Sequence, residues 1–273
     1  MPDLDEILHV VDGWGVANVA AAVVGPDGVR AVHGDPRHVF GWASVTKPLT
    51  ALAVLDAVEQ GIVDLDEPAG PPGATVRHLL AHASGLQFET GPTLAAPGRR
   101  RIYSNAAYDL LGALLAERAG RPFDAVLRER VLEPLGMTGT TLVGRPSAGL
   151  RGSLEDLLGF AAECLRPRFL TADSLRAAST VAFPGLPGVV PGVGLFDPCD
   201  CGLGFEIHGS KAPHWMGERN SPATFGHFGG AGTFIWVDPV ADVALVALTD
   251  RMFGPWALEA WPSLSDAVLA AVS

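Results

Sequence analysis

Strand-like segments lie at both ends of this chain, and a long helical stretch separates them. Residues 16–24 and 29–33 are rich in valine and alanine, and the turn sequence Gly25-Pro26-Asp27-Gly28 between them predicts a hairpin. Three further strands are expected towards the C-terminus, at about residues 204–208, 232–238 and 243–250. Strands from the two ends can bury their apolar faces by joining each other, so we expect one sheet built from distant segments, with a helical lobe alongside.

Helices account for most of the chain between the strands. Residues 44–60 and 106–119 have long apolar patterns, and each is followed by a stop glycine, Gly61 or Gly120. Ser153 begins a capping pattern before an apolar helix that runs to about Cys164. Further helices are expected at about 3–12, 76–83 and 122–132, and after Pro255 with a new start at Ser263.

Charge and composition exclude several classes of protein. The 273 residues carry 19 basic and 30 acidic side chains, a formal net charge of −11, and 48% of them are apolar. This apolar share rules out intrinsic disorder, and the acidic balance argues against a nucleic-acid partner, which needs a basic face. No run approaches the roughly 20 apolar residues of a membrane helix, so no membrane association is expected.

The cellular compartment is predicted from the N-terminus and the cysteines. The first six residues are acidic and lack the basic start and apolar core of a signal peptide. Three cysteines, an odd number, fit a reducing compartment without a disulfide framework. We therefore expect a cytoplasmic protein, and its oligomeric state stays open.

The first candidate for chemistry is the sequence Ser44-Val45-Thr46-Lys47. Positions three apart share one face of a helix, so Lys47 can point at the Ser44 hydroxyl. A lysine partly removed from water has a lowered pKa and can help take the proton that makes serine nucleophilic. Proline is tolerated only in a first helical turn, so Pro48 places Ser44 near the positive end of the helix dipole. The alternative is an ordinary helix start capped by a serine.

The second candidate is Tyr103-Ser104-Asn105, which directly precedes the helix at 106–119. A phenol near an ammonium group has a depressed pKa and can act as a base. The Asn105 amide can hold a substrate carbonyl or the lysine. The alternative is a tyrosine packed at a helix start, with Asn105 as the cap.

The third candidate is Gly226-His227-Phe228-Gly229-Gly230-Ala231-Gly232, which leads into a strand. Four glycines in seven residues indicate a close approach of the backbone to a ligand or to another element. A glycine N–H at such an edge can complete an oxyanion hole. A glycine-rich turn without a catalytic role explains the segment equally well.

Taken together and in this order, the three motifs resemble the penicillin-recognising serine hydrolases, in the branch with class C β-lactamases, D-alanyl-D-alanine carboxypeptidases and family VIII carboxylesterases. Further similar stretches are residues 75–86 (TVRHLLAHASGL), Pro97-Gly98, 133–137 (EPLGM) and 202–205 (GLGF). The resemblance covers about residues 17–250. It implies an α/β (α+β) fold of the β-lactamase/transpeptidase type, with an antiparallel sheet flanked by helices and a helical lobe. One domain would span residues 1–273, with an α/β lobe at about 1–60 and 200–273 and a helical lobe at about 61–199.

The resemblance also implies roles for the candidate residues. Ser44 would be the nucleophile, Lys47 its partner and Tyr103 the general base. Backbone N–H groups of Ser44 and Gly230 would form the oxyanion hole. The substrate site would be formed by Asn105, His227, Gly229 and Gly230. The reaction would be acyl transfer through an acyl-enzyme, without a metal or a cofactor.

One position departs from the pattern of this family. His227 stands where its β-lactamases and carboxypeptidases usually carry lysine, and histidine is mostly neutral at neutral pH. A weaker anion site suits small esters or amides better than β-lactams or cell-wall peptides, so we expect β-lactam turnover to be weak. The pocket is expected to be walled by aromatics such as Phe40, Trp42 and Phe228, with the Pro- and Gly-rich loop 183–198 as its rim.

The sequence also allows other interpretations. The same acyl-enzyme can serve a β-lactamase, a D-amino-acid peptidase or an acyltransferase, and a homologue that only binds is the alternative from another class. His78 and His82 have the spacing of a zinc protease, but the required glutamate is missing, so both are interpreted as structural. The Cys199-Asp200-Cys201 spacing is too tight for the usual Cys-x-x-Cys metal site. Ser84 lacks the first glycine of a Gly-x-Ser-x-Gly elbow and is not a competing nucleophile.

Overall fold

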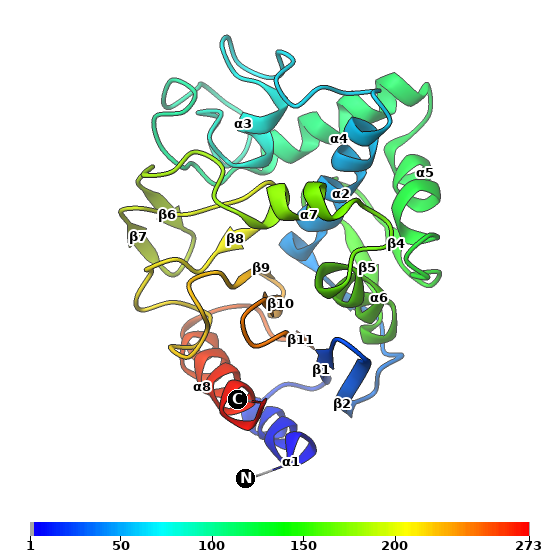
Figure 1. The fold of residues 1–273 in the computed structure, drawn as a ribbon, viewed down its shortest axis with the longest axis vertical. Coiled ribbons are helices and arrows are strands. Elements are labelled where there is room, and N and C mark those ends of the chain that lie inside the picture. Colours follow the sequence, from blue (N-terminus) through cyan, green and yellow to red (C-terminus); the bar gives the residue numbers. More distant parts are fainter. Residues whose placement is uncertain (1–2, 273) are drawn as a thin grey trace.

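A six-stranded antiparallel sheet forms one half of the molecule in the computed structural model, which describes residues 3–272 (Figure 1). In sheet order the strands are β2 (Gly28–Gly34), β1 (Val19–Gly25), β11 (Val243–Thr249), β10 (Thr233–Asp238), β9 (Phe225–Gly229) and β8 (Glu206–Ile207). The two ends of the chain meet where β1 pairs with β11, from Val19↔Thr249 to Val24↔Ala244. The prediction of one sheet built from distant segments is therefore confirmed.

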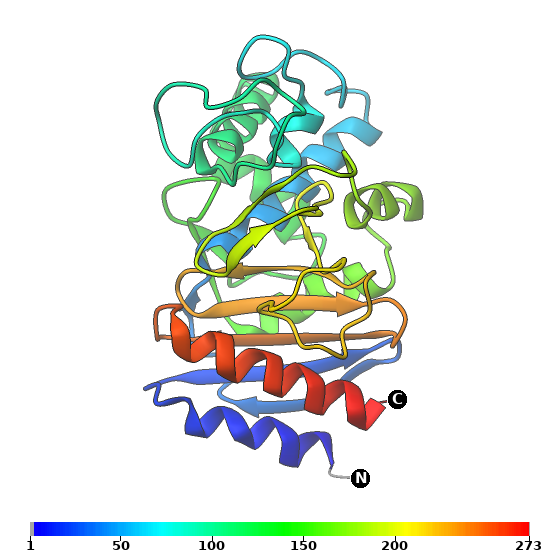
Figure 2. The same ribbon diagram turned by 90° about the vertical axis from the view of Figure 1, so that its left-hand side faces the viewer.

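Both faces of the sheet are covered, which explains why its central strands are almost wholly apolar. Along β1, Ala21 and Val23 pack into one core cluster, whereas Ala20, Ala22 and Val24 pack into the other. Helices α1 (Leu4–Leu8) and α8 (Pro255–Val272) lie side by side across the first face (Figure 2). Helix α6 (Leu154–Leu165) packs on the second face against β1, β10 and β11. Burial on both sides thus replaces the alternation of apolar and polar residues that a half-exposed sheet shows.

Helix α2 (Thr46–Glu59) is buried along most of its length. Helix α4 (Asn105–Ala119) contacts α2, α3 (Val76–Leu80) and α5 (Phe123–Leu127). Ser104 caps α4 by accepting the backbone N–H of Ala107, and Gly120 ends it in the left-handed conformation. Shorter elements complete the fold: α7 (Ala172–Ser179), β3 (Phe40–Gly41), β4 (Thr141–Leu142), β5 (Leu150–Gly152), β6 (Gly188–Val190), β7 (Gly194–Phe196), and the helical turns His9–Trp14, Ala43–Val45 and Arg128–Leu132.

Some elements differ from the sequence-based expectation. Residues 225–229, expected only as a glycine-rich edge before a strand, form strand β9 itself. The expected loop at 183–198 contains the hairpin of β6 and β7, and helix α7 was not predicted. Helix α8 runs through Pro262 without a new start, because Trp261 and Leu264 on either side of it are buried against the sheet. Their packing offsets the roughly 3 kcal/mol that an internal proline costs.

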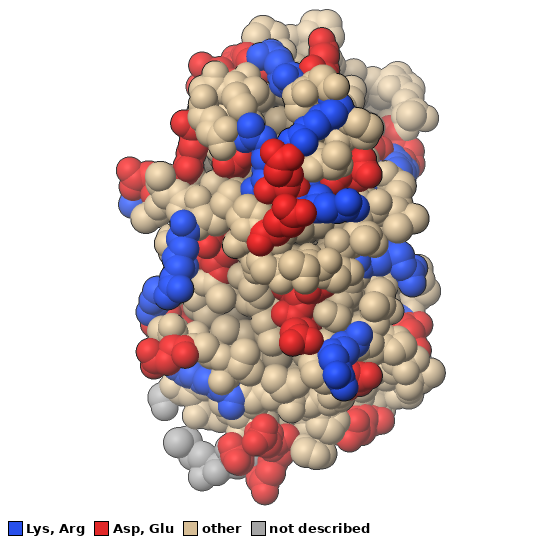
Figure 3. Space-filling model, turned by 90° about the vertical axis from the view of Figure 1, so that its right-hand side faces the viewer, with Lys and Arg blue, Asp and Glu red and all other residues tan. Residues whose placement is uncertain are grey.

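Charged side chains of both signs are interspersed on the face shown in Figure 3, and no basic patch stands out there. Within residues 3–272, no helix has both the length and the apolar character needed to cross a bilayer.

Candidate active site

Ser44 lies in the helical turn Ala43–Val45 that leads into α2, and its side chain lines a pocket. Two contacts hold this turn. The Trp42 N–H donates to the Leu150 carbonyl at 2.9 Å, and Thr233 Oγ1 donates to the Trp42 carbonyl at 2.9 Å. Ala43 has a φ of +46°, a left-handed conformation that costs a non-glycine residue about 1–3 kcal/mol. Tertiary contacts therefore maintain a strained backbone directly before the candidate nucleophile.

Lys47 is fully buried, and its ammonium group has three acceptors. The distance from Nζ is 3.1 Å to Ser44 Oγ, 2.7 Å to Asn105 Oδ1 and 2.9 Å to the Ser147 carbonyl. Burial lowers the pKa of Lys47 to about 7, and two nearby carboxylates oppose this shift only in part. The prediction of a lysine beside Ser44 with a lowered pKa is confirmed.

Asn105 holds the lysine from the first turn of α4. Its Nδ2 donates to Glu89 Oε1 at 2.8 Å, which fixes the amide so that Oδ1 faces Lys47. The carboxylate of Glu89 is itself paired with Arg145, at 2.6 Å. Ser104, not Asn105, is the cap of the helix, so the amide of Asn105 is free for this contact.

Tyr103 lies between His82 and Lys47. Its ring centroid is 4.6 Å from that of His82 and 4.7 Å from Lys47 Nζ, and Ser44 also lines the pocket that Tyr103 lines. Burial raises the pKa of Tyr103 above its usual value. The expected depression of this pKa is wrong: the ammonium group lies against the ring face, and the buried surroundings disfavour a phenolate.

His227 lies on β9, opposite Ile235 of β10. Its Nδ1–H donates to the carbonyl of Phe228 at 2.7 Å, which leaves Nε2 without a proton when the ring is neutral. Burial, and next the charge of Lys47, lower the pKa of His227 to about 4. This position therefore carries no positive charge at neutral pH.

The two glycines proposed for the substrate site differ in their surroundings. A Cβ at Gly229 would lie 2.2 Å from the Trp42 carbonyl oxygen and 2.5 Å from Thr233 Oγ1. A Cβ at Gly230 would meet no atom within 4 Å. Gly229 therefore permits β9 to pack against the turn that carries Ser44, whereas Gly230 lines the pocket.

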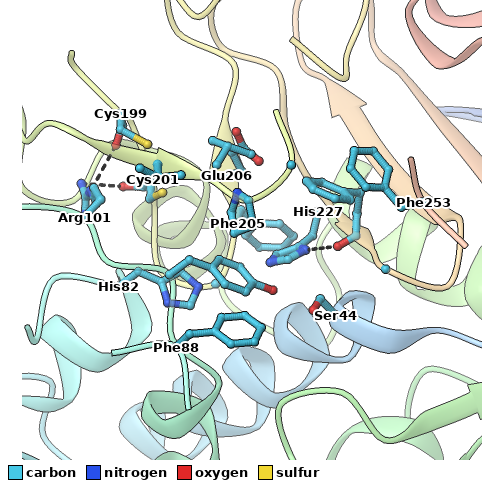
Figure 4. Close-up of a pocket in the computed structure, with 18 residues that line it drawn as sticks. Ser44, His82, Phe88, Arg101, Cys199, Cys201, Phe205, Glu206, His227 and Phe253 are labelled. Carbon is cyan, nitrogen blue, oxygen red and sulfur yellow. Dashed lines mark hydrogen bonds between the residues drawn. The ribbon is translucent and has the colours of Figure 1, made fainter. Parts of the chain in front are cut away.

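A pocket of about 310 Å³ opens over Ser44 (Figure 4). Tyr103, His227 and Gly230 also line it, whereas Lys47, Asn105 and Gly229 are not part of its lining. The rest of the wall is largely apolar and includes Phe88, Val189, Val190, Pro191, Phe205, Phe228 and Phe253.

The expected pocket walls are only partly correct. Phe228 is a wall residue, but Phe40 and Trp42 are buried in the core, with 3% and 0% of their surfaces exposed. The end of β6 and the turn that follows it contribute Val190 and Pro191 to the rim, as expected for the segment 183–198.

Arg101 was missed by the sequence analysis, because nothing in the run Arg99-Arg100-Arg101 indicates that the third arginine is buried. Its guanidinium is buried, and among the described residues it forms no ion pair. Instead it donates to five backbone carbonyls, those of Ala81, Ala182, Phe183, Cys199 and Cys201. Arg101 thereby connects three separate loops around the pocket.

Glu206 was also missed. It lines the pocket, but its carboxylate accepts from His214 Nε2 at 2.7 Å and Trp215 Nε1 at 2.9 Å. Figure 4 shows this carboxylate pointing away from His227. Its charge is therefore used within the protein rather than aimed at a ligand.

The two histidines considered for zinc have other partners. His78 Nδ1 is 2.9 Å from Thr75 Oγ1, and His82 Nδ1 accepts the backbone N–H of Ser104 at 3.1 Å. Within residues 3–272, no three His, Cys, Asp or Glu side chains are grouped so that they could hold a metal ion.

Several known proteins and one family model are similar to this chain. The Beta-lactamase family model matches residues 8–269. A crystal structure described as a β-lactamase from Mycobacterium bovis is 55% identical, covers 97% of this chain and 99% of its own, and superposes with a TM-score of 0.96. The D-alanyl-D-alanine-carboxypeptidase/endopeptidase AmpH of Escherichia coli is 29% identical over 50% of this chain and 48% of its own length. The esterase EstB of Burkholderia gladioli is 31% identical over 36% of this chain and 37% of its own.

These alignments with the curated relatives span about half of their length or less, whereas the family model spans nearly the whole chain. The superposition on the Mycobacterium bovis structure also places the fold in the β-lactamase/transpeptidase class, as the motifs implied. The chain therefore belongs to the β-lactamase family of serine hydrolases.

Proposed function

We propose that this protein hydrolyses small uncharged esters or amides through an acyl-enzyme formed on Ser44. The observation that carries the proposal is the position of Lys47 Nζ, 3.1 Å from Ser44 Oγ, in surroundings that lower the lysine pKa to about 7. Near neutral pH, roughly half of the molecules then carry an uncharged amine beside the serine.

The geometry makes Lys47 the base for acylation. A neutral amine has one lone pair, and among its three contacts only Ser44 has a proton to give, because the Asn105 and Ser147 oxygens act solely as acceptors here. The other two N–H bonds of the amine can go on donating to those oxygens. Lys47 therefore accepts the Ser44 proton as Oγ attacks the substrate carbonyl.

Tyr103 keeps its proton at neutral pH, since burial raises its pKa. We assign it the role of a hydroxyl donor that relays a proton to the leaving group, in place of the general base that the motif suggested. The carbonyl oxygen would be held by the backbone N–H groups of Ser44 and Gly230, which both line the pocket. Water admitted through the pocket mouth would then hydrolyse the acyl-enzyme.

The preference for uncharged substrates rests on the electrostatics of the pocket. His227 is neutral because its pKa lies near 4, and the charge of Arg101 is taken up by backbone carbonyls. Neither offers a free cation to a substrate carboxylate. The aromatic and aliphatic walls favour an apolar acyl group, since burying one removes its surface from water.

A second candidate function is β-lactam hydrolysis. The β-lactamase description of the 55% identical structure favours it. Both activities use the same acyl-enzyme, so they differ in the recognition of the substrate carboxylate rather than in the nucleophile.

The experiment is a substrate panel combined with active-site labelling. Purified protein is treated with a fluorophosphonate, and the labelled peptide is identified by mass spectrometry. Hydrolysis of p-nitrophenyl esters of several chain lengths, a chromogenic cephalosporin and D-amino-acid amides is measured in parallel. We expect the label on Ser44 and the highest kcat/KM for an apolar ester.

The control is Ser44→Ala, with Ser84→Ala as the matched serine variant outside the turn. Ser44→Ala should abolish labelling and lower ester turnover by at least about 10³-fold, whereas Ser84→Ala should keep both. An unlabelled Ser44 would favour the binding homologue, and preferred turnover of the cephalosporin would favour the second candidate.

A further inference from the structure

Two cysteines lie together in the wall of the pocket that contains Ser44. Cys199 and Cys201 both line this pocket, and Cys201 forms an isolated β-bridge with Glu206. Asp200 between them is not part of the lining, so both cysteines face the pocket and Asp200 does not. Figure 4 shows the two sulfur atoms near each other, on the side of the pocket where Arg101 lies.

The two thiols interact directly. Their mutual interaction raises the pKa of Cys199 and lowers that of Cys201, so that Cys201 has the greater thiolate character. The nearby cations of Arg101 and Lys211 act in the same direction on Cys201. Cys199 is 2% exposed, whereas Cys201 is partly exposed, so a small molecule in the pocket reaches Cys201 first.

The backbone around the pair is tied to the rest of the pocket. Arg101 donates to the carbonyls of Cys199 and Cys201, at 3.2 Å in both cases. Lys211 Nζ donates to the Asp200 carbonyl at 2.9 Å. A covalent bond between the sulfur atoms would therefore pull on the contacts that position the pocket wall.

We propose that Cys199 and Cys201 form a redox-active dithiol site, which peroxides oxidise to a disulfide that reshapes the pocket. The Cys201 thiolate attacks one oxygen of hydrogen peroxide, which breaks the O–O bond and, with one proton, yields a sulfenic acid and water. The Cys199 sulfur then attacks the sulfenic sulfur, forms the S–S bond and releases a second water. In total two thiols and one peroxide give one disulfide and two waters, and a thiol reductant reverses the reaction.

The third cysteine of the chain is a matched internal control. Cys164 lies in α6, 5% exposed, away from the pocket lining, and burial raises its pKa well above the usual value. A protonated, buried thiol reacts slowly with peroxide. The oxidation rates of the pair and of Cys164 can therefore be compared in one sample of the wild-type protein, without a variant whose folding can differ.

The first experiment measures oxidation by peptide mapping. The full chain is treated with a small excess of hydrogen peroxide, remaining thiols are alkylated, and the peptides are analysed without reduction. We expect an intramolecular Cys199–Cys201 disulfide, lighter by two hydrogen atoms, at a rate at least about tenfold above that of Cys164 oxidation. Dithiothreitol should restore both thiols.

Two variants separate the steps. In Cys199→Ser, a sulfenic acid should accumulate on Cys201 and be trapped by dimedone. In Cys201→Ser, Cys199 should stay reduced at the same peroxide dose. Oxidation of Cys164 as fast as the pair, or disulfides only between molecules, would overturn the proposal.

The effect on turnover rests on the proposed function, and the mass measurement does not. Ester hydrolysis by the wild type should fall several-fold on oxidation and recover with dithiothreitol, while Cys201→Ser should show no peroxide-dependent change relative to its own untreated sample. If the disulfide forms but ester turnover stays unchanged, the proposal that the disulfide reshapes the pocket is wrong. Absence of ester hydrolysis in every sample counts against the proposed function alone, because the peptide map still tests the dithiol.

Discussion

Lys47 shows how burial converts an ordinary cation into a base. Its side chain is fully buried, so the charged form loses water, while all three of its acceptors are neutral oxygens that can also accept from the uncharged amine. Desolvation therefore outweighs the attraction of the nearby carboxylates, and the lysine pKa falls to about 7. Burial shifts the pKa of Tyr103 in the opposite direction, upwards, because the charged form of tyrosine is the deprotonated one.

This contrast predicts the pH dependence of the reaction. If neutral Lys47 is the base, kcat/KM for an uncharged ester rises with pH and levels off above about 7, because raising the pH removes the proton from the amine. If tyrosinate were the base, kcat/KM would rise only at a much higher pH, since the pKa of Tyr103 is raised.

The measurement is a pH–rate profile of wild type, Tyr103→Phe and Lys47→Arg. Tyr103→Phe should lower the rate but keep the limb near neutrality. Lys47→Arg should lose at least about 10²-fold, because arginine does not deprotonate. A limb that stays near pH 7 in Lys47→Arg would contradict the assignment.

The neutral side chain of His227 leads to a prediction about the preference between charged and uncharged substrates. In His227→Lys, a fixed positive charge would stand at the pocket wall, where the native ring is neutral. We expect the ratio of cephalosporin to ester kcat/KM to rise by about tenfold or more, equivalent to about 1.4 kcal/mol in carboxylate recognition. Steady-state kinetics on both substrates test this, with His227→Gln as the neutral control, which should leave the ratio near its native value.

At the scale of elements, the contact between β9 and the Ser44 turn decides whether the site is assembled. The strand approaches so closely that Gly229 has no room for a Cβ beside the Trp42 carbonyl. Glycine weakens the strand pattern in the sequence, which is why residues 225–229 were not predicted as a strand. The pairing with β10, from Val237↔Phe225 to Thr233↔Gly229, supplies the hydrogen bonds that the composition does not suggest.

The neighbouring glycines provide a matched test. Gly229→Ala should displace the Ser44 turn, destabilise the protein by about 1–3 kcal/mol and lower ester turnover strongly. Gly230→Ala should change stability by less than about 0.5 kcal/mol and keep its backbone N–H for the substrate oxygen. Denaturant unfolding and kcat/KM of both variants decide the matter, and equal effects of the two substitutions would show that the close approach is unimportant.

The contacts of Lys47 and Asn105 differ in how far the sequence could predict them. Lys47 was expected beside Ser44 from spacing alone, because helical geometry is local. The link from Lys47 through Asn105 to Glu89 joins α2, α4 and a loop, and no spacing rule contains it. The alternative in which Asn105 only caps α4 is wrong, because Ser104 provides the cap and the Asn105 amide is free for the lysine.

At the scale of the whole molecule, one core runs through the sheet and the helices. A single cluster of buried residues includes Ala22 and Val246 of the sheet, Leu52 of α2, Leu111 of α4 and Phe160 of α6. Helix α6 packs on the sheet although the expected lobe boundaries place it in the helical lobe. We therefore propose that the two lobes fold as one cooperative domain.

The aromatic residues make this testable. All six tryptophans lie within residues 1–60 and 200–273, and both tyrosines lie within residues 61–199. Tryptophan fluorescence therefore reports on one lobe, and tyrosine absorbance on the other. Denaturant transitions followed by the two signals should coincide within error, because a shared core gives a two-state transition. Separate midpoints would show two units that unfold independently.

The sequence by itself predicted the long helices, the strands near the two ends of the chain, the residue types of the site and the family, because periodicity, caps and motif spacing are local properties. Tertiary structure alone decided the direction of the Tyr103 pKa shift, the walls of the pocket and the five carbonyl partners of Arg101. Desolvation and hydrogen bonding depend on surfaces that segments far apart in the chain bring together, and no local pattern records which segments those are.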